Sequence, residues 1–193
     1  FSLSSSRTNL RILGVDPGLT RCGVGIIDAN VDRSVSLVTV TVLKTDKDLE
    51  LPLRLLQLRE ELSTLIEEFS PDRIAVERVF AQHNLRTVMG TAQASAIAFV
   101  EAAQRGIPVD MHTPSEVKAS VTGTGRANKV QVATMVGRLL TLPEGKLLPD
   151  ATDALALAIC NAWRGGAGTA PQGTLTPAQK RWREAERQAK KRG

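Results

Sequence analysis

The sequence has few of the residues on which several common chemistries depend. Its 193 residues include two cysteines, two histidines and no tyrosine, and aromatic residues make up only 3%. Cys22 and Cys160 stand alone, without a CxxC pair or a nearby histidine, so neither a zinc site nor a disulfide framework is expected, and a reducing, cytoplasmic location is favoured. With only His83 and His112 and no G-x-S-x-G elbow, histidine-assisted serine or cysteine catalysis has little to work with. The shortage of aromatic residues also argues against a stacking array for single-stranded nucleic acid.

Long hydrophobic runs are missing as well. The apolar stretch at 94–100 is interrupted by Ser95 and stops at Glu101, well short of the ~20 residues that a membrane-spanning helix needs. The remaining composition, 42% hydrophobic and 23% charged, is typical of one globular domain, and a chain of this length buries about 70% of its unfolded surface. Residues 1–9 have no apolar signal core and are expected to be disordered or derived from the cloning vector.

An excess of positive charge is confined to two segments of the chain. The net charge is +5, yet residues 1–175 contain equal numbers of acidic and basic residues, and residues 176–193 contain seven basic and two acidic ones. The neutral part also has an acid-free window, Val117–Pro143, whose basic residues are Lys118, Arg126, Lys129 and Arg138. Such a window favours a surface that faces a polyanion. A solvated face whose counter-charges lie elsewhere in space would explain the same pattern.

The hydrophobic pattern predicts an α/β domain built on a mixed, five-stranded sheet with helices on both faces. The expected strands span 10–15, 22–28, 34–43, 73–79 and 107–111, the first three as an antiparallel meander, and the expected helices span 51–69, 84–104, 114–121, 129–142 and 150–163. Helical crossovers of about 20 residues require the later strands to run parallel. The domain is therefore placed at 10–163. A Gly/Ala/Pro linker and a basic tail follow at 164–193, with a capping-box-like sequence at 176–179.

Four acidic residues, at three sites along the chain, stand where an acid is not the structural default. Asp16 ends the first strand, Glu77 interrupts an apolar strand, and Asp150 and Asp153 lie three residues apart at the start of an apolar helix. Each has a structural explanation when taken alone: Asp16 as an Asx-turn residue, Glu77 as a strand-end residue facing water, and Asp150 as a helix N-cap with Asp153 as its capping partner.

Taken together, the four carboxylates indicate a metal site. The strands that hold Asp16 and Glu77 are expected to be neighbours, and Asp150 and Asp153 share one side of their helix. Four converging carboxylates would repel one another unless hard cations such as Mg²⁺ joined them. Two such ions about 4 Å apart can activate a water and stabilise the leaving oxygen of a phosphodiester displacement.

The motifs at these positions resemble those of a known family. The chain from about Leu10 to Trp163 is similar to RuvC, the bacterial Holliday junction resolvases, through four segments in the family's order and spacing: 14–18 (GVDPG), 75–80 (AVERVF), 113–118 (TPSEVK) and 150–156 (DATDALA). The resemblance implies an RNase H-like nuclease domain, a homodimer, Mg²⁺-dependent symmetrical nicking of two junction strands in DNA recombination and repair, and action with the RuvA and RuvB branch-migration proteins. Two metal ions per site are implied, and Mn²⁺ is expected to substitute for Mg²⁺.

The resemblance also assigns roles to single residues. It implies that Asp16, Glu77, Asp150 and Asp153 are the catalytic, metal-binding carboxylates. Residues that would contact DNA are Lys118, Lys129, Phe80, Arg126 and Arg78, with Phe80 either stacking on a base at the junction or serving as a core residue. The loop with Gly123 and Gly125 could admit phosphate to backbone amides, and His83 and His112 are expected to be structural or surface residues.

Two other functions remain open at this stage. The pattern Asp16-x-Gly18-x-Thr20 is also similar to the first phosphate loop of sugar kinases and actin-like ATPases, although those proteins need two such domains. A non-catalytic DNA-binding module with a basic tail is the second alternative, against which the presence of all four carboxylates argues.

Overall fold

The computed structural model describes residues 9–78, 85–145 and 147–164, and for residues 85–87 it describes the backbone only. Its elements follow the expected order along the chain. They are β1 (Leu10–Asp16), β2 (Arg21–Ala29), β3 (Val35–Lys44), α1 (Leu51–Phe69), β4 (Arg73–Glu77), α2 (Leu85–Gln104), β5 (Val109–His112), α3 (Pro114–Thr122), α4 (Lys129–Leu139) and α5 (Pro149–Arg164).

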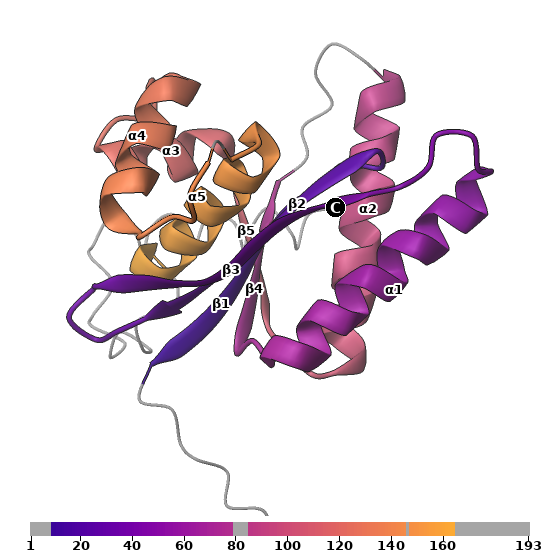
Figure 1. The fold of residues 1–193 in the computed structure, drawn as a ribbon, viewed down its shortest axis with the longest axis horizontal. Helices are drawn as coiled ribbons and strands as arrows, with labels where there is room; N and C mark the ends of the chain where they lie inside the picture. The colour runs from indigo at the N-terminus through magenta and orange to yellow at the C-terminus, as the bar shows by residue number, and fades with distance from the viewer. Residues whose placement is uncertain (1–8, 79–84, 146, 165–193) are drawn as a thin grey trace, which may run out of the picture.

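The strands form one mixed sheet in the order β3-β2-β1-β4-β5. The pairs β1–β2 and β2–β3 are antiparallel, while β1–β4 and β4–β5 are parallel, as the helical crossovers require. Helices α1 and α2 cover one face of the sheet, and α3, α4 and α5 cover the other (Figure 1). The predicted mixed, five-stranded sheet with helices on both faces is confirmed.

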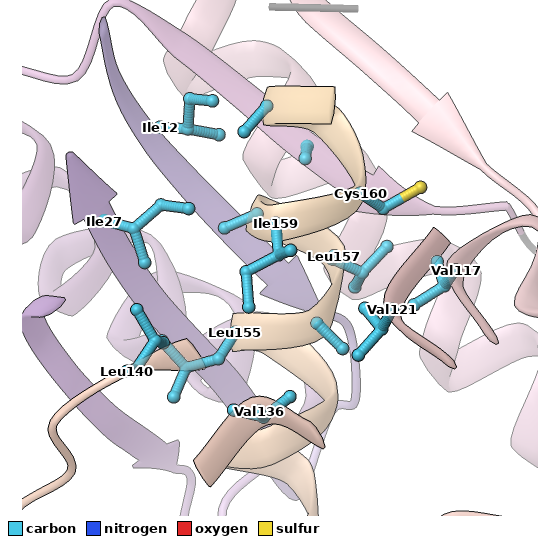
Figure 2. Close-up of a cluster of buried hydrophobic side chains, with 14 of the residues drawn as sticks. Ile12, Ile27, Val117, Val121, Val136, Leu140, Leu155, Leu157, Ile159 and Cys160 are labelled. Atoms are coloured by element: carbon cyan, nitrogen blue, oxygen red, sulfur yellow. The ribbon is translucent and has the colours of Figure 1, made fainter. Parts of the chain in front are cut away.

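Two cores separate these layers. One lies between the sheet and the pair α1 and α2, and includes Leu58, Leu62 and Ile66 on the inner side of α1. The other surrounds α5, whose buried residues run from Ala154 to Ala162 without a break. Figure 2 shows this second core, with Ile12 and Ile27 of the sheet on one side of α5 and Val117 and Val121 of α3 on the other. Helix α5 is thus the centre of the three-helix layer.

Close contact between α5 and the sheet depends on glycines in β1 and β2. A Cβ atom at Gly14 would overlap the carbonyl oxygen of Ala154, and a Cβ at Gly23 would overlap that of Asp150. At these two positions the helix backbone therefore lies directly on the strands. This approach fixes the height of α5 above the sheet.

Three element boundaries differ from the expected ones by two residues or more. Strand β4 ends at Glu77 rather than at 79, since Arg78 is no longer in a strand. Helix α4 ends at Leu139 rather than at 142, because Leu140 is extended and turns its side chain into the core. Leu142 also precedes Pro143, which disfavours the helical region. Strand β5 begins at Val109 rather than at 107, since Ile107 hydrogen-bonds back to Ala102 at the end of α2.

Some expectations fall outside the described residues. These are the disordered N-terminal segment, Phe80 and His83, and the linker and basic tail beyond 164. Within the described part of the chain, no helix is long and apolar enough to cross a membrane.

Candidate active site

Two acidic side chains meet at the carboxyl edge of the sheet. Asp16 is the last residue of β1 and Glu77 the last residue of β4. These strands are parallel neighbours, and Val15 pairs with Val76, so the two acids stand side by side at the strand ends. The expectation that the two strands are adjacent is confirmed.

The other two acidic residues lie on the first turns of α5. The amides of Ala151 and Thr152 both donate to the carbonyl oxygen of Leu148, so Pro149 is the first helical residue and Asp150 the second. The alternative in which Asp150 caps the helix is therefore wrong. As an acid in the first turn, Asp150 is favoured by the helix dipole, but its carboxylate does not cap the helix.

A single cavity brings the four carboxylates together. It measures about 260 Å³, and its charged lining residues are Asp16, Glu77, Asp150, Asp153, Lys118 and Lys129. These six charged side chains come from the ends of β1 and β4, the start of α5, and the layer of α3 and α4. Six residues named from the sequence thus occupy one site.

Burial and repulsion change the acidity of the two strand-end residues. Burial, followed by the charges of Glu77, Asp153 and Asp150, raises the pKa of Asp16 to about 7. Burial and the charge of Asp153 also raise the pKa of Glu77, against the opposing effect of Lys129 and Lys118. A cavity that disfavours ionised carboxylates to this degree is one in which a cation would be strongly attracted.

Two basic side chains pair with the helix carboxylates. Lys129 Nζ lies 3.2 Å from Asp153 Oδ2, and the negative charge of Asp153 is the first cause of the raised pKa of Lys129. Arg21 Nε lies 3.0 Å from Asp150 Oδ2. That oxygen is buried and accepts no hydrogen bond with good geometry within the described part of the chain. It therefore remains an unsatisfied acceptor.

These observations fit a hard divalent cation. The donors are carboxylate oxygens, one of them is buried without a hydrogen bond, and their mutual repulsion would be relieved by positive charge. In the present side-chain conformations, no three His, Cys, Asp or Glu side chains among the described residues are close enough to share one ion. Shared ligation thus requires side-chain rotation, with Arg21 and Lys129 competing for one oxygen each of Asp150 and Asp153.

Helices α3 and α4 are oriented by capping boxes. Thr113 N donates to Glu116 Oε2 at 2.8 Å and Glu116 N donates to Thr113 Oγ1 at 3.2 Å, which fixes the start of α3 and the direction of Lys118 one turn later. Asn128 and Gln131 form the equivalent pair at the start of α4, where Lys129 is the first residue. The TPSEVK segment therefore has two roles. Its Thr113 and Glu116 fix the start of α3, and its Lys118 lines the cavity.

The other DNA-contact candidates are less closely associated with the cavity. Arg126 is exposed in the α3–α4 loop and Arg78 is exposed just beyond Glu77, and neither lines the cavity. Gly123 ends α3 with a φ of 82°. Phe80 and His83 lie outside the described residues. His112 is buried, and its Nε2 lies 3.1 Å from Asn161 Nδ2, which agrees with a structural role.

Sequence reasoning missed two polar residues, one beside the cavity and one further along α5. Arg21 contacts Asp150, but a single cation at the start of a strand gives no signal of its own. Asn161 is fully buried and its Nδ2 donates to Asp110 Oδ2 at 2.8 Å, tying α5 to β5. A polar residue inside the apolar run of α5 could have drawn attention to it.

Comparison with known proteins identifies the family. The model of the family described as crossover junction endodeoxyribonuclease RuvC matches residues 12–161. The chain is 54% identical to the crossover junction endodeoxyribonuclease RuvC of Leifsonia xyli subsp. xyli, covering 92% of each chain, and 56% identical to that of Renibacterium salmoninarum, covering 94% of this chain and 95% of the relative. The chain belongs to the RuvC family of crossover junction endodeoxyribonucleases.

A solved RuvC structure agrees in fold. The structure of T. thermophilus RuvC in complex with Holliday junction substrate superposes with a TM-score of 0.77 at 29% identity, covering 83% of this chain and 97% of that one. The RNase H-like fold class and the assignment as a nuclease acting on DNA are confirmed. RuvC-type resolvases are metal-dependent nucleases, which agrees with the chemistry of the cavity.

Proposed function

We propose that this chain resolves four-way DNA junctions by divalent-cation-dependent hydrolysis of phosphodiester bonds, nicking two strands symmetrically as a homodimer. One observation carries the proposal. A single cavity contains Asp16, Glu77, Asp150 and Asp153 together with two lysines, which combines a cation site with a phosphate site. The solved relative that binds a Holliday junction substrate supports the same substrate class.

The four carboxylates would hold the cation, with Mg²⁺ as the proposed ion, two per site, and Mn²⁺ as a substitute. When bound, such ions supply an activated water and neutralise charge on the leaving oxygen. Asp16 and Glu77 contribute from the rigid sheet edge, while Asp150 and Asp153 contribute from α5. Asp16 must lose its proton to bind a cation, so cation binding releases a proton at neutral pH.

The basic side chains would receive the DNA backbone. Lys118 and Lys129 line the cavity and can pair with phosphates next to the scissile bond. Lys129 first has to leave Asp153, to which it is now paired. Arg126 in the α3–α4 loop and Arg78 beside Glu77 extend this basic surface, and Phe80 is proposed to stack on a junction base.

Further partners are proposed from the family resemblance alone. They are a second copy of this chain and the RuvA and RuvB branch-migration proteins. The basic segment at 176–193 is proposed as an additional, structure-independent contact with DNA.

The test is a nicking assay on matched DNA substrates. Four-way, three-way and linear duplex DNA of the same arm sequences are incubated with the purified chain, with Mg²⁺, with Mn²⁺ and with EDTA. We expect paired, symmetrical nicks in the four-way DNA only, and none in EDTA. Equal cutting of the linear duplex would refute junction selectivity, and cutting in EDTA would refute cation dependence. ATP binding by calorimetry without any nicking would instead support the actin-like alternative.

A further inference from the structure

A second cavity adjoins the candidate active site. It measures about 410 Å³ and lies between the turn after β1, the first part of α1 and residues Gly90 and Thr91 of α2. Asp150 lines both cavities, so they meet at this residue. We name the second cavity the Arg21 groove, after the arginine in its lining that contacts Asp150.

The turn that forms one wall of the groove is firmly fixed. A Cβ at Gly18 would overlap the carbonyl oxygen of Arg21, so the turn is tight enough to require glycine. The buried Thr45 hydroxyl donates to the Leu19 carbonyl oxygen from just beyond β3. This is the segment with the Asp16-x-Gly18-x-Thr20 pattern, to which the candidate active site assigns no role beyond Asp16.

Arg54 brings a positive charge that no carboxylate neutralises within the described part of the chain. Its Nε donates to Thr45 Oγ1 at 3.0 Å, and its Nη2 donates to Thr20 Oγ1 at 2.9 Å and to the Leu19 carbonyl oxygen at 3.3 Å. All three acceptors are neutral, and among the described residues Nη1 has no acceptor. The guanidinium is therefore held in place with its charge and part of its donor capacity still available.

Arg21 is the movable cation of the groove. Its side chain is 56% exposed, and its contact with Asp150 Oδ2, at 3.0 Å, lacks hydrogen-bond geometry. Because the arginine is exposed and the contact lacks hydrogen-bond geometry, the pair holds Arg21 only weakly. A phosphate group offers a guanidinium two oxygens at once and is the better partner.

We propose that the Arg21 groove binds a backbone phosphate of the DNA strand that enters the candidate active site, and that Arg21 leaves Asp150 for this phosphate. The proposal deepens the proposed function and rests on it. Arg21 and Arg54 face the phosphate together, and Asp150 becomes available to a cation. The exchange couples the two ligands, because DNA that takes Arg21 removes the competitor for Asp150.

The test uses Arg21→Gln in the full chain, with two binding measurements that need no cleavage. Calorimetry with Mg²⁺ alone should show several-fold tighter binding, since the competing cation is gone. Junction binding in EDTA should become weaker, and the slope of log K against log salt should fall by about 0.9, because one phosphate is no longer neutralised. A merely structural role of Arg21 would weaken both interactions, so the opposite signs identify the exchange.

Two further variants serve as controls. Arg21→Lys keeps the charge and should retain both the Mg²⁺ affinity and the salt slope. Arg33→Gln removes an arginine from the β2–β3 turn, where it lies over the Trp163 ring, and should leave both measurements unchanged. An unaltered salt slope in Arg21→Gln, or weaker Mg²⁺ binding, would overturn the proposal.

Further measurements distinguish a DNA phosphate from a free anion, and failure of the groove from failure of the proposed function. Inorganic phosphate and ATP are titrated into the unsubstituted protein and into the Arg21→Gln variant. Anion binding that disappears in the variant without a change in the junction salt slope would overturn the proposal in favour of a small-anion site. If the original chain does not nick four-way DNA, the proposed function fails. If it nicks normally and only the Arg21→Gln predictions fail, the groove alone is refuted.

Discussion

At the scale of single residues, the candidate active site opposes the stability of the metal-free protein. Asp16 ionises near pH 4 in an unfolded chain and near pH 7 in the folded one, because burial and three neighbouring carboxylates disfavour its charge. Above pH 4 the unfolded chain releases this proton and the folded chain keeps it. Stability therefore falls as the pH rises from 4 to 7 and then levels off.

Asp16→Asn removes this titration and should stabilise the protein in EDTA at pH 8. A shift of about 3 pKa units corresponds to about 4 kcal/mol in the free energy of unfolding, which is an upper bound. At pH 5 the gain should be much smaller. Urea unfolding of both proteins at pH 5, 6, 7 and 8 measures the difference. A gain that does not change with pH would show that Asp16 has an ordinary pKa.

Asp153→Asn tests the role of the helix carboxylates. The amide is nearly isosteric and gives up only an exposed pairing with Lys129, so stability should change by less than about 1 kcal/mol. Junction binding in EDTA should be equal or slightly tighter, because one negative charge near the phosphates is gone. Cleavage in Mg²⁺ should fall by orders of magnitude, since a carboxamide is a poorer ligand for a hard cation.

A gel-shift titration and a nicking time course measure the two effects on Asp153→Asn. Asp32→Asn is the matched control, because it makes the same change in the β2–β3 turn, where an amide oxygen can still accept from Ser34. Near-normal cleavage by Asp153→Asn would exclude this residue from the cation site. The site would then have to be rebuilt from the other three carboxylates.

The sequence predicts these carboxylates for a physical reason. Each is an acid placed at the end of an apolar element, and the order of the elements brings the ends together. Arg21 and Asn161 could not be predicted in the same way, because each meets a partner from a distant part of the chain through packing alone. The loose Arg21–Asp150 contact depends on how far α5 reaches over the β1–β2 turn, which no local pattern encodes.

At the scale of elements, the bare backbone contact between α5 and the sheet positions half of the site. Gly14→Ala should push α5 away from β1, because the new methyl group meets the Ala154 carbonyl rather than a flexible side chain. We expect a decrease of at least about 1–3 kcal/mol in the free energy of unfolding, together with a loss of nicking activity even where the protein remains folded.

Gly137→Ala provides the comparison for that variant. Gly137 lies inside α4, and a Cβ there would have Leu142 Cδ1 as its nearest neighbour at an ordinary 3.8 Å. It should stabilise the protein by about 0.5–1 kcal/mol through helix propensity. Thermal unfolding of both variants measures the contrast. Equal stability of the two would mean that α5 can shift without cost.

Element types are predictable here because the strand and helix periodicities are clear, whereas two boundaries depend on tertiary contacts. The apolar spacing of α4 continues past Leu139, but the chain turns because Leu140 is buried against the α5 core. Likewise, Ile107 looks like the first residue of a strand, yet its amide completes the end of α2. In both places packing overrides a local pattern that is otherwise reliable.

At the scale of the whole molecule, the excess charge lies beyond the described domain, in residues 176–193. Removing this segment should weaken binding to four-way and linear duplex DNA alike, because its charges can meet phosphate anywhere. The salt slope should fall by about 0.9 for each phosphate that the segment had neutralised. Gel-shift titrations at several salt concentrations measure both effects. Loss of junction preference with unchanged duplex binding would contradict this prediction.

The burial of α5 has a consequence for how rapidly different parts of the protein exchange their amide hydrogens. From Ala154 to Ala162 every residue of this helix is buried between the sheet and two other helices, so its amides should exchange only when the whole domain unfolds. The helix that carries Asp150 and Asp153 at its start would then keep its place on the sheet throughout a catalytic cycle. Adjustment to each incoming ligand falls to side-chain rotations, which are complete within nanoseconds where they are exposed.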